Sequence, residues 1–508
     1  MHPVTWAAYV LILLTAGALV TWGLARWRGL CGWFAVVATA LALVSALRLS
    51  LAVAESGTPL RGEVANLGLV GARLGFHVDG VSAVLMVLVL LVGLLCAVFS
   101  TRYLGEADAA ATARYYPAFL LFLAGMCGVL CLSDWLFFLV AWEFMSLPAY
   151  LLIVHDRERP EALRAGLKYF LMTHIGNLGL FVGVLVLYRA ASPGGSFDFA
   201  AVSGALGALI AARPWLAGIV VGLMALAFMT KAGVFPMGDW LPDAHAEAPS
   251  PVSVLLSGIM IKVAAYALAR TAVPFFTAWP ALQVMLVAMA TLTMLVGIAL
   301  VAAQVDLKRL LAYSSVSQIG YVILGFGLGS YLGVFAALYH VLAHAAAKSL
   351  LFMGAGAVEQ STGTRRLDEL RGLRVSMPIT SACFLVGVLT LSGVPLLAGF
   401  VSKFSLFLAT VQLGGFWWAG AIAILTGVLT LVVMTRVVVQ VFWRAEGEPA
   451  RARSEVSAAM VGSMVVLALL CVLLGTGPTL LWPALSQATQ ALLGSTQPVG
   501  GLIAAFRP

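Results

Sequence analysis

The chain has 508 residues, of which 62% are apolar, and its charged side chains are 29 Lys and Arg against 21 Asp and Glu. One charged residue in ten cannot cover the surface of a water-soluble protein, so that class is excluded. Because a membrane-spanning helix needs about 20 apolar residues, the composition leaves room for about fourteen spans of a polytopic α-helical protein. In such a protein the net charge of +8 reports topology rather than affinity for nucleic acid.

Apolar runs separated by turn residues or charges predict fourteen spans. The first run has no basic residues before it, so we expect a retained first span rather than a cleaved signal. The glycine-rich segment 56–79 is expected to form an external hairpin or loop, and the tail from about 484 is too short for a fifteenth span. The predicted spans are 5–25, 29–49, 80–101, 115–133, 135–154, 169–188, 216–237, 250–270, 280–302, 311–329, 332–357, 378–408, 414–441 and 458–482.

The basic residues between these spans predict the orientation of the chain. Seventeen lie in connections that follow odd-numbered spans, namely Arg26, Arg28, Arg102, Arg114, Arg157, Arg159, Arg164, Lys168, Lys308, Arg309, Arg365, Arg366, Arg371, Arg374, Arg444, Arg451 and Arg453. Seven lie on the other side, namely Arg48, Arg61, Arg73, Arg189, Arg213, Arg270 and Arg507. By the positive-inside rule, the odd connections face the cytoplasm of a bacterial-type inner membrane and both termini face outwards.

The sequence contains no pattern for a metal or a redox cofactor. Its six cysteines lie in apolar runs without a CxxC pair or a His/Cys cluster, which argues against iron–sulfur, haem c and zinc-ribbon sites. It also has no phosphate-binding glycine loop and no hydrophilic stretch long enough for a nucleotide-binding domain. We therefore expect no cofactor in this chain, and expect its energy to come from an ion gradient or from partner subunits.

Five basic residues are predicted within spans, where each charge costs several kcal/mol unless it is hydrated or paired. Lys231 is followed by Ala-Gly-Val-Phe-Pro, and Lys262 lies midway along its span, so neither ammonium group is placed to reach the membrane surface. We therefore interpret Lys231 and Lys262 as functional rather than structural residues. The other three are Lys348, Lys403 and Arg436.

Glu143 is the one carboxylate predicted well inside the spans of the first half. Burial favours the neutral forms of Glu and Lys whereas pairing favours their charged forms, so a buried Glu–Lys pair can switch between two states. We expect Glu143 and Lys231 to form such a couple. A static salt bridge that fixes the register of two helices is the alternative interpretation.

His340, His344 and Lys348 are spaced by four residues, so they share one face of a helix. Histidine titrates near neutral pH, and a column of such groups can pass a proton along the helix. Zinc is a rival interpretation, but the HExxH glutamate is missing and a lysine continues the same face. Histidines that are simply packed in the core are the other alternative to the proton relay that we favour.

Two spans combine Gly, Pro and Lys, which is the composition of a broken helix. They are Lys231-Ala-Gly-Val-Phe-Pro and the segment 393–403. Proline removes a backbone donor and clashes with the preceding turn, which leaves carbonyl groups free for water or a cation. A broken helix in each half is typical of transporters built from repeats. The same offset of 172 residues separates Lys231 from Lys403 and Lys168 from His340.

The segment from Lys231 to Lys262 resembles the signature of the antiporter-like proton-translocating membrane subunits. These subunits occur in respiratory complex I (the NuoL, NuoM and NuoN types), in Mrp cation/proton antiporters (the A and D types) and in group 4 membrane-bound hydrogenases. Trp142-Glu-Phe-Met-Ser and the segments 306–321 and 393–403 are similar to further family segments. The resemblance covers roughly residues 75–445.

The resemblance implies an all-α polytopic fold of about 14 transmembrane helices, with two inverted five-helix repeats and with helices 7 and 12 broken. It divides the chain into four parts. They are helices 1–3 with the external loop (1–110), a first repeat of helices 4–8 (111–275), a second repeat of helices 9–13 (276–445), and helix 14 with the tail (446–508).

The resemblance also implies a proton path through buried ionisable residues. Glu143 and Lys231 would be the charge pair of the first half-channel, and Lys262 the central relay. Lys403 would be the outlet, joined to the centre by His340, His344 and Lys348. Because the sequence ends soon after the predicted helix 14, we expect no long lateral helix of the NuoL type. Lys403 stands where the NuoM type usually has Glu, and the segment 243–253 is closer to the hydrogenase and Mrp members.

We therefore expect a proton-translocating subunit of a redox-driven complex that resembles NADH:quinone oxidoreductase or a membrane-bound hydrogenase. Its partners would be other membrane subunits, including a peripheral redox arm or sister antiporter-like subunits, and it would bind no nucleic acid. Two alternatives stay open. They are a subunit of an Mrp-type Na⁺/H⁺ antiporter and a structural membrane anchor for a catalytic arm.

Overall fold

The computed structural model describes residues 3–67, 71–105, 108–192, 194–444 and 454–494, and it is built almost entirely of helices. Thirteen helical segments in these ranges are long and apolar enough to cross a membrane, which confirms the all-α polytopic fold. They are α1 (Thr5–Gly23), α2 (Arg28–Ser56), α3 (Gly80–Tyr103), α4 (Ala109–Cys131), α5 (Trp135–Ile153), α6 (Pro160–Ala191), α8 (Pro214–Ala232), α10 to η3 (Ser250–Phe275), α12 (Pro280–Ala302), α13 (Leu307–Gly327), α14 (Tyr331–Thr362), α17 with η4 (Trp417–Trp443) and α18 (Ala458–Thr476).

The remaining predicted span is broken into two short helices, α15 (Pro378–Ser392) and α16 (Ala398–Gln412). Each has 15 residues, which at about 1.5 Å per residue is too short to cross a hydrocarbon core of about 30 Å alone. The break predicted after Lys231 is present as well, because α8 ends at Ala232 and the short helix α9 (Trp240–Glu247) follows. Both helix breaks thus lie where the sequence predicts them.

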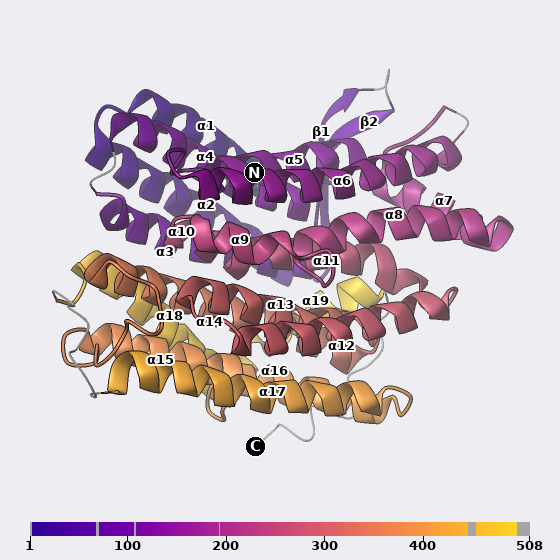
Figure 1. The fold of residues 1–508 in the computed structure, drawn as a ribbon. Coiled ribbons are helices and arrows are strands. Elements are labelled where there is room, and N and C mark those ends of the chain that lie inside the picture. Colours follow the sequence, from indigo (N-terminus) through magenta and orange to yellow (C-terminus); the bar gives the residue numbers. More distant parts are fainter. Residues whose placement is uncertain (1–2, 68–70, 106–107, 193, 445–453, 495–508) are drawn as a thin grey trace.

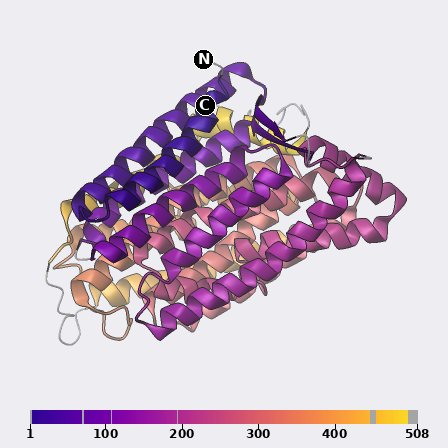
Figure 2. The ribbon, with the colours of Figure 1, turned by 90° about the horizontal axis from the view of Figure 1, so that it is seen from above.

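The helices lie side by side in one bundle (Figure 1). The segments from α4 to α11 (Ile261–Ala272) occupy the upper half of that view, and those from α12 to α17 occupy the lower half. Figure 2 shows the same bundle from above, with the N-terminal helices at one edge. The two groups of spans are therefore neighbours within a single helical body.

A β-hairpin marks one face of the bundle. Strands β1 (Leu60–Leu67) and β2 (Ala72–Val78) pair antiparallel, which confirms the hairpin expected in segment 56–79. We call this face the hairpin face. The opposite face, which carries Arg159, Arg309, Arg365 and Arg366, is the arginine face.

The two groups of spans begin at opposite faces. α3 starts directly after the hairpin, so α4 begins at the arginine face. Arg270 near the end of α11 pairs with Asp79 beside the hairpin, so α12 begins at the hairpin face. This opposite direction is what inverted repeats require, and the division into repeats at 111–275 and 276–445 stays a prediction.

Several helices differ from their predicted bounds. α6 and α13 begin before 169 and 311, so Lys168, Lys308 and Arg309 lie on helices rather than in connections. A proline in the first turn of α6 and the Asp306 cap on the amide of Arg309 explain these early starts. Arg451, Arg453 and Arg507, which the topology prediction used, lie outside the described residues.

Besides α9, two α-helices in the described ranges have no counterpart among the predicted spans. α7 (Phe199–Ala212) has 14 residues and is capped by Asp198, which accepts hydrogen bonds from two amides of its first turn. α19 (Trp482–Leu493) lies in the region of the predicted tail and packs against α3 and α14. Both are too short to span a membrane, which is why a search for spans passes over them.

Candidate functional site

The predicted site residues come from five different helices. Glu143 is on α5, Lys231 on α8, Lys262 on α11 and Lys403 on α16, while His340, His344 and Lys348 are on α14. The lysines at 231, 262 and 348 and both histidines are buried, and Lys403 is half-buried.

Glu143 does not contact Lys231 directly. Its carboxylate accepts a hydrogen bond from the Asn177 side chain at 2.8 Å and lies 3.2 Å from Nε2 of His174, both on α6. The Asn177 carbonyl oxygen in turn accepts a hydrogen bond from the indole of Trp142 at 2.7 Å. Glu143 therefore sits in a polar group between α5 and α6, of which the sequence predicted Glu143 alone.

The Lys231 ammonium group is held one turn further along α5. It donates a hydrogen bond to the hydroxyl of Ser146, and it lies 5.3 Å from the ring centre of Trp142 and 5.8 Å from that of Tyr169. Trp142 thus touches both the lysine and, through Asn177, the group around Glu143. The expected Glu143–Lys231 couple is an indirect one in this structure.

The helix break behind Lys231 has a glycine that no other residue could replace without strain. Gly233 has φ +77°, and a Cβ there would lie 2.6 Å from Leu241. The Thr230 carbonyl, which the break deprives of its usual partner four residues on, accepts a hydrogen bond from the indole of Trp240 at 2.8 Å. The break therefore places Lys231 in the last turn of α8, next to α5 and α6.

Lys262 follows a π-helical turn, η2 (Leu256–Met260). Its ammonium group donates to the Ser257 carbonyl in that turn. A π-helical turn leaves backbone groups that the α-helical ladder does not use, and such turns are frequent at functional sites. Tyr169, which faces Lys231, also lies 4.0 Å from the sulfur of Met260 in the same turn.

Two adjacent serines of α13 connect Lys262 with Lys348. Ser257 shares a hydrogen bond of 2.7 Å with the hydroxyl of Ser315. Lys348 donates to the hydroxyl of Ser314, and to the Leu311 carbonyl at 2.7 Å. The central and the second-half lysines are thus joined through hydroxyl and carbonyl oxygens.

The histidine column continues from Lys348 to Lys403. The rings of His344 and His340 are stacked with their centres 5.8 Å apart, and His340 stacks on Tyr321 at 5.3 Å. The ammonium group of Lys403 lies over the same tyrosine ring, 4.6 Å from its centre. The predicted alignment of His340, His344 and Lys348 on one face is therefore present. Tyr321 on α13 lies between this column and Lys403 on α16.

Lys403 sits on the second helix break. Its ammonium group donates to the Leu391 carbonyl of α15 at 2.8 Å. Gly393 has φ +85°, and a Cβ there would lie 2.9 Å from Cδ of Lys403, so the glycine makes room for the lysine side chain. Here the carbonyl that the break releases binds the lysine itself.

Sequence reasoning missed three residues of this row. His174 and Asn177 both lie in a predicted span, and polar residues within a span are the signal that could have identified them. His245 on α9 is fully buried and stacks on Phe352 at 4.7 Å. Neither ring nitrogen of His245 or of His344 has a hydrogen-bond partner among the residues that the structure describes.

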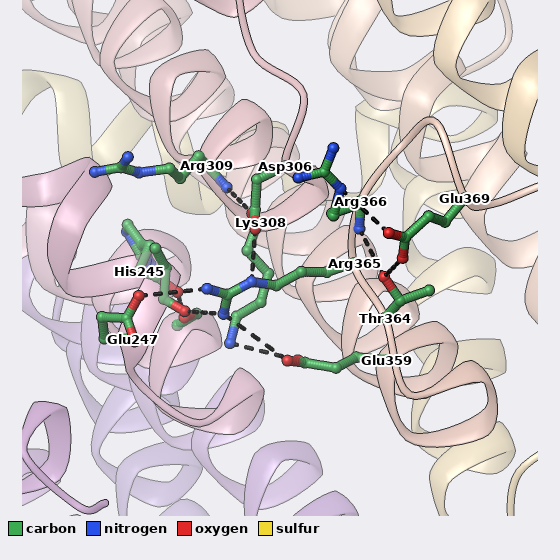
Figure 3. A network of polar contacts seen from close by, with 12 residues as sticks. His245, Glu247, Asp306, Lys308, Arg309, Glu359, Thr364, Arg365, Arg366 and Glu369 are labelled. Atoms are coloured by element: carbon green, nitrogen blue, oxygen red, sulfur yellow. Dashed lines mark hydrogen bonds and ion pairs between the residues drawn. The ribbon is translucent and has the colours of Figure 1, made fainter. Parts of the chain in front are cut away.

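A network of charges covers the arginine-face end of this row (Figure 3). Arg365 pairs with Asp306 at 2.5 Å, with Glu247 at 3.3 Å and with Glu359 at 3.8 Å. Beside this network is a cavity of about 500 Å³, whose charged lining residues are Glu161, Arg164, Lys168, Asp243, Glu247, Asp306, Arg309 and Arg365. Lys168 lies 2.6 Å from Asp239 and 2.7 Å from Asp243.

The site provides no metal centre in the described ranges, where no three His, Cys, Asp or Glu side chains are close enough to hold an ion. The groups that bind the four lysine ammonium groups are hydroxyl and carbonyl oxygens. Chemically, the arrangement is a row of lysine and histidine side chains, which are titratable groups, interspersed with hydroxyl and carbonyl oxygens.

Comparison with known families identifies the family of this chain. Residues 133–430 match the family described as "NADH:quinone oxidoreductase/Mrp antiporter, TM". The chain belongs to this family of membrane subunits. Residues 65–116 match a second family, the N-terminus of chain 5 of NADH-ubiquinone oxidoreductase (complex I). The predicted resemblance to antiporter-like membrane subunits is thus confirmed.

Individual relatives come from three kinds of complex. Hydrogenase-4 component B of Escherichia coli K12 is 31% identical over 83% of this chain and 65% of its own length. The N-type subunit of NADH-quinone oxidoreductase from Desulforudis audaxviator is 33% identical over 87% of this chain and 89% of its own. A D-type component of the Na⁺/H⁺ antiporter from Alkalihalophilus pseudofirmus is 30% identical over 72% of each chain.

Solved structures share the whole fold. A chain of the membrane-bound sulfane sulfur reductase, an archaeal respiratory membrane complex, superposes with a TM-score of 0.84 at 27% identity, over 96% of this chain and 98% of that chain. A chain of the Mrp complex from Dietzia sp. DQ12-45-1b gives a TM-score of 0.85 at 24% identity, over 97% and 98%. The protein is therefore an antiporter-like, multi-pass membrane subunit.

Proposed function

We propose that this chain moves protons across the membrane as one subunit of a redox-driven complex. The path runs from Glu143 and Lys231 to Lys262, and then along the α14 column to Lys403. The relatives named for hydrogenase-4 and for NADH-quinone oxidoreductase support a redox-driven complex.

The observation that carries this proposal is how the buried lysines are bound. The ammonium groups of Lys231, Lys262, Lys348 and Lys403 bind hydroxyl and carbonyl oxygens. Among the described residues, the lysines that pair with carboxylates are Lys168 and Lys308. A lysine placed in a membrane without a counter-ion is costly to keep charged, so a purely structural role would not favour four of them in one row.

The polar atoms between these lysines support a hydrated path. His245, His344 and Gln318 are buried, and their side-chain nitrogens and the Gln318 oxygen lack a protein partner within the described residues. Buried polar atoms are as a rule hydrogen-bonded to protein or to water. Water molecules that bridge these groups would join Lys262, Lys348 and the histidines into a continuous relay.

The flank of the molecule supports neighbouring membrane subunits as partners. The side chains of Glu143 and His174 are 25% and 27% exposed. They emerge on a face of α5 and α6 that otherwise exposes Val140, Phe144, Leu147, Leu171, Ile175 and Leu178. Two polar side chains that faced lipid here would be costly, so we propose that a sister membrane subunit of the complex covers this flank.

The charge distribution supports one orientation. Arg159, Arg309 and Arg365 gather at the arginine face, which would be the cytoplasmic side of an inner membrane. Both termini would then lie outside.

The test is proton uptake by the complete complex in sealed liposomes, followed with a pH-sensitive dye under each candidate reductant. Lys231→Ala should lower the proton flux at least about tenfold, because it removes a relay group whose loss no neighbour replaces. Arg436→Ala is the matched control, since Arg436 is also in a span but is exposed. Wild-type flux in Lys231→Ala would refute the charge-relay mechanism.

A second candidate is a subunit of an Mrp-type Na⁺/H⁺ antiporter, which the match to the Alkalihalophilus pseudofirmus antiporter favours. Proton flux that follows a Na⁺ pulse and needs no reductant would support this candidate. Unchanged transport after joint neutralisation of Glu143, Lys231, Lys262 and Lys403 would instead favour a structural anchor.

A further inference from the structure

A second polar column starts at Lys262 and runs towards the hairpin face. Lys262, Tyr266 and Arg270 follow each other at intervals of four residues on the last span of the predicted first repeat, so they share one face of α11. The path proposed above uses Lys262 and leaves Tyr266 and Arg270 without a role.

Tyr266 is hydrogen-bonded to Arg270 of the same column and to Ser82 on the neighbouring helix α3. Its hydroxyl lies 3.2 Å from the hydroxyl of Ser82 on α3 and accepts a hydrogen bond from Nε of Arg270 at 3.1 Å. The guanidinium group also lies over the tyrosine ring at 5.2 Å. A hydroxyl with hydrogen-bonding groups on either side is suited to pass a proton.

Arg270 ends the column in an ion pair with Asp79, the residue that caps α3. Nε2 of His77 lies 3.9 Å from the same carboxylate, and Arg61 donates to Nδ1 of His77 at 3.2 Å. His77 is partly exposed and Arg61 is exposed. These contacts thus lead from buried Tyr266 to the protein surface.

A cavity of about 570 Å³ opens along this line. It extends from the buried Tyr266 to the exposed Arg61 and Arg73 on the hairpin, and it touches Arg270 and His77 on the way. Three carboxylates, those of Glu63, Asp134 and Asp198, also line it. The cavity therefore connects the surface of the hairpin face with a hydroxyl one helical turn from Lys262.

We propose that this cavity is a second proton outlet, from Lys262 through Tyr266 to the hairpin face, and that the Arg270–Asp79 pair is its latch. The inference rests on the proposed function, because it needs Lys262 to carry protons. In this structure Lys262 is turned towards Ser257, which corresponds to the state that feeds the α14 column. A lysine side chain is long and flexible enough to turn one helical turn the other way. While the latch is closed, Asp79 holds Arg270 against Tyr266, where its Nε donates to the tyrosine hydroxyl and so occupies the oxygen that would accept a proton.

The first experiment compares outlets in the reconstituted complex. Lys403→Ala should keep a residual proton flux, and adding Tyr266→Phe to it should remove at least about two-thirds of that residual flux, since the phenylalanine keeps the ring and loses the hydroxyl. Tyr331→Phe is the matched control, because its hydroxyl also bonds a single serine, Ser486, outside the cavity. A residual flux that Tyr266→Phe leaves unchanged overturns the second outlet.

The second experiment tests the latch. Asp79→Asn keeps an oxygen that can cap the Ser82 amide but removes the charge that holds Arg270. The passive proton leak should rise about threefold or more, whereas Asp108→Asn, which alters the equivalent cap of α4, should leave it unchanged. An unchanged leak in Asp79→Asn overturns the latch.

Failures of the two proposals can be told apart. Full flux in Lys231→Ala refutes the proposed function, and the second outlet with it. Loss of flux in Lys231→Ala together with full residual flux in the Tyr266 double variant refutes the second outlet alone. Thermal unfolding of each variant in detergent verifies that the comparison is made on folded protein.

Discussion

The two broken spans differ in what binds the backbone carbonyl that each break releases. In the first, Lys231 precedes the break and the released Thr230 carbonyl binds the indole of Trp240. In the second, Lys403 follows the break and binds the released Leu391 carbonyl itself. The Lys231 ammonium group therefore binds a side chain, that of Ser146, whereas the Lys403 ammonium group binds a backbone carbonyl.

The surroundings of the two lysines extend this difference. Lys231 binds Ser146, which is one turn from Glu143 on α5, and Glu143 is in turn held by His174 and Asn177. Lys403 has the ring of Tyr321 and the histidine column as neighbours. Because a carboxylate can gain or lose its charge whereas a backbone carbonyl cannot, the first half is suited to receive the driving signal and the second half to follow it.

The largest effect that would test this comparison is expected from Glu143→Gln. Glutamine keeps an oxygen that can accept the hydrogen bond from Asn177, but it removes the carboxylate that contacts His174 and lies near Lys231. We expect proton flux of the reconstituted complex to fall about tenfold or more. Glu158→Gln in the exposed connection before α6 should change nothing, and equal flux in both variants would show that the first half needs no charge switch.

A middle-sized effect is expected from adding one methyl group at each break. Gly233→Ala and Gly393→Ala both force alanine into the left-handed region, which costs about 1–2 kcal/mol and should lower the thermal unfolding temperature of both variants. The added Cβ would press on Leu241 in the first case and on Lys403 in the second. Flux should therefore fall more in Gly393→Ala than in Gly233→Ala. Gly462→Ala on α18, which has open space, is the control for both.

The lysines could be predicted as site residues because a charged residue within an apolar run is recognisable from the sequence alone. Lys231, Lys262 and the α14 column needed only the membrane cost of a charge and the helical spacing of four residues. The helix breaks were predictable for a similar reason, since glycine and proline act on their own backbone. These local features are the part of the fold and of the site that one sequence specifies.

Contacts between helices were not predictable in this way. The partner of Glu143 depends on how α5 and α6 are rotated about their axes, and that rotation turned His174 towards the carboxylate. The 172-residue offset aligns Lys231 with Lys403 but not Gly233 with Gly393, so the repeat cannot be extended from the lysines to the breaks. The Arg365 network likewise joins segments that lie far apart in the sequence.

The smallest effect is expected from Ser402→Ala, which tests how firmly the second half is organised. The Ser402 hydroxyl donates to the Gly399 carbonyl at 3.0 Å and lies 2.9 Å from Nδ1 of His340, so the serine and the imidazole share a hydrogen bond that orients the ring. Without it His340 keeps its stacking on Tyr321 and loses only its orientation, and flux should fall about twofold to threefold.

Ser146→Ala is the matched change in the first half, because the Ser146 hydroxyl binds the ammonium group of Lys231 directly. It should lower the flux more than Ser402→Ala does, since it removes a ligand of the lysine rather than a support of a histidine. Proton flux at one reductant concentration, normalised to the amount of folded complex, measures both. If Ser402→Ala had the larger effect, the second half would contain the sensitive switch, and the contrast between the two breaks would be reversed.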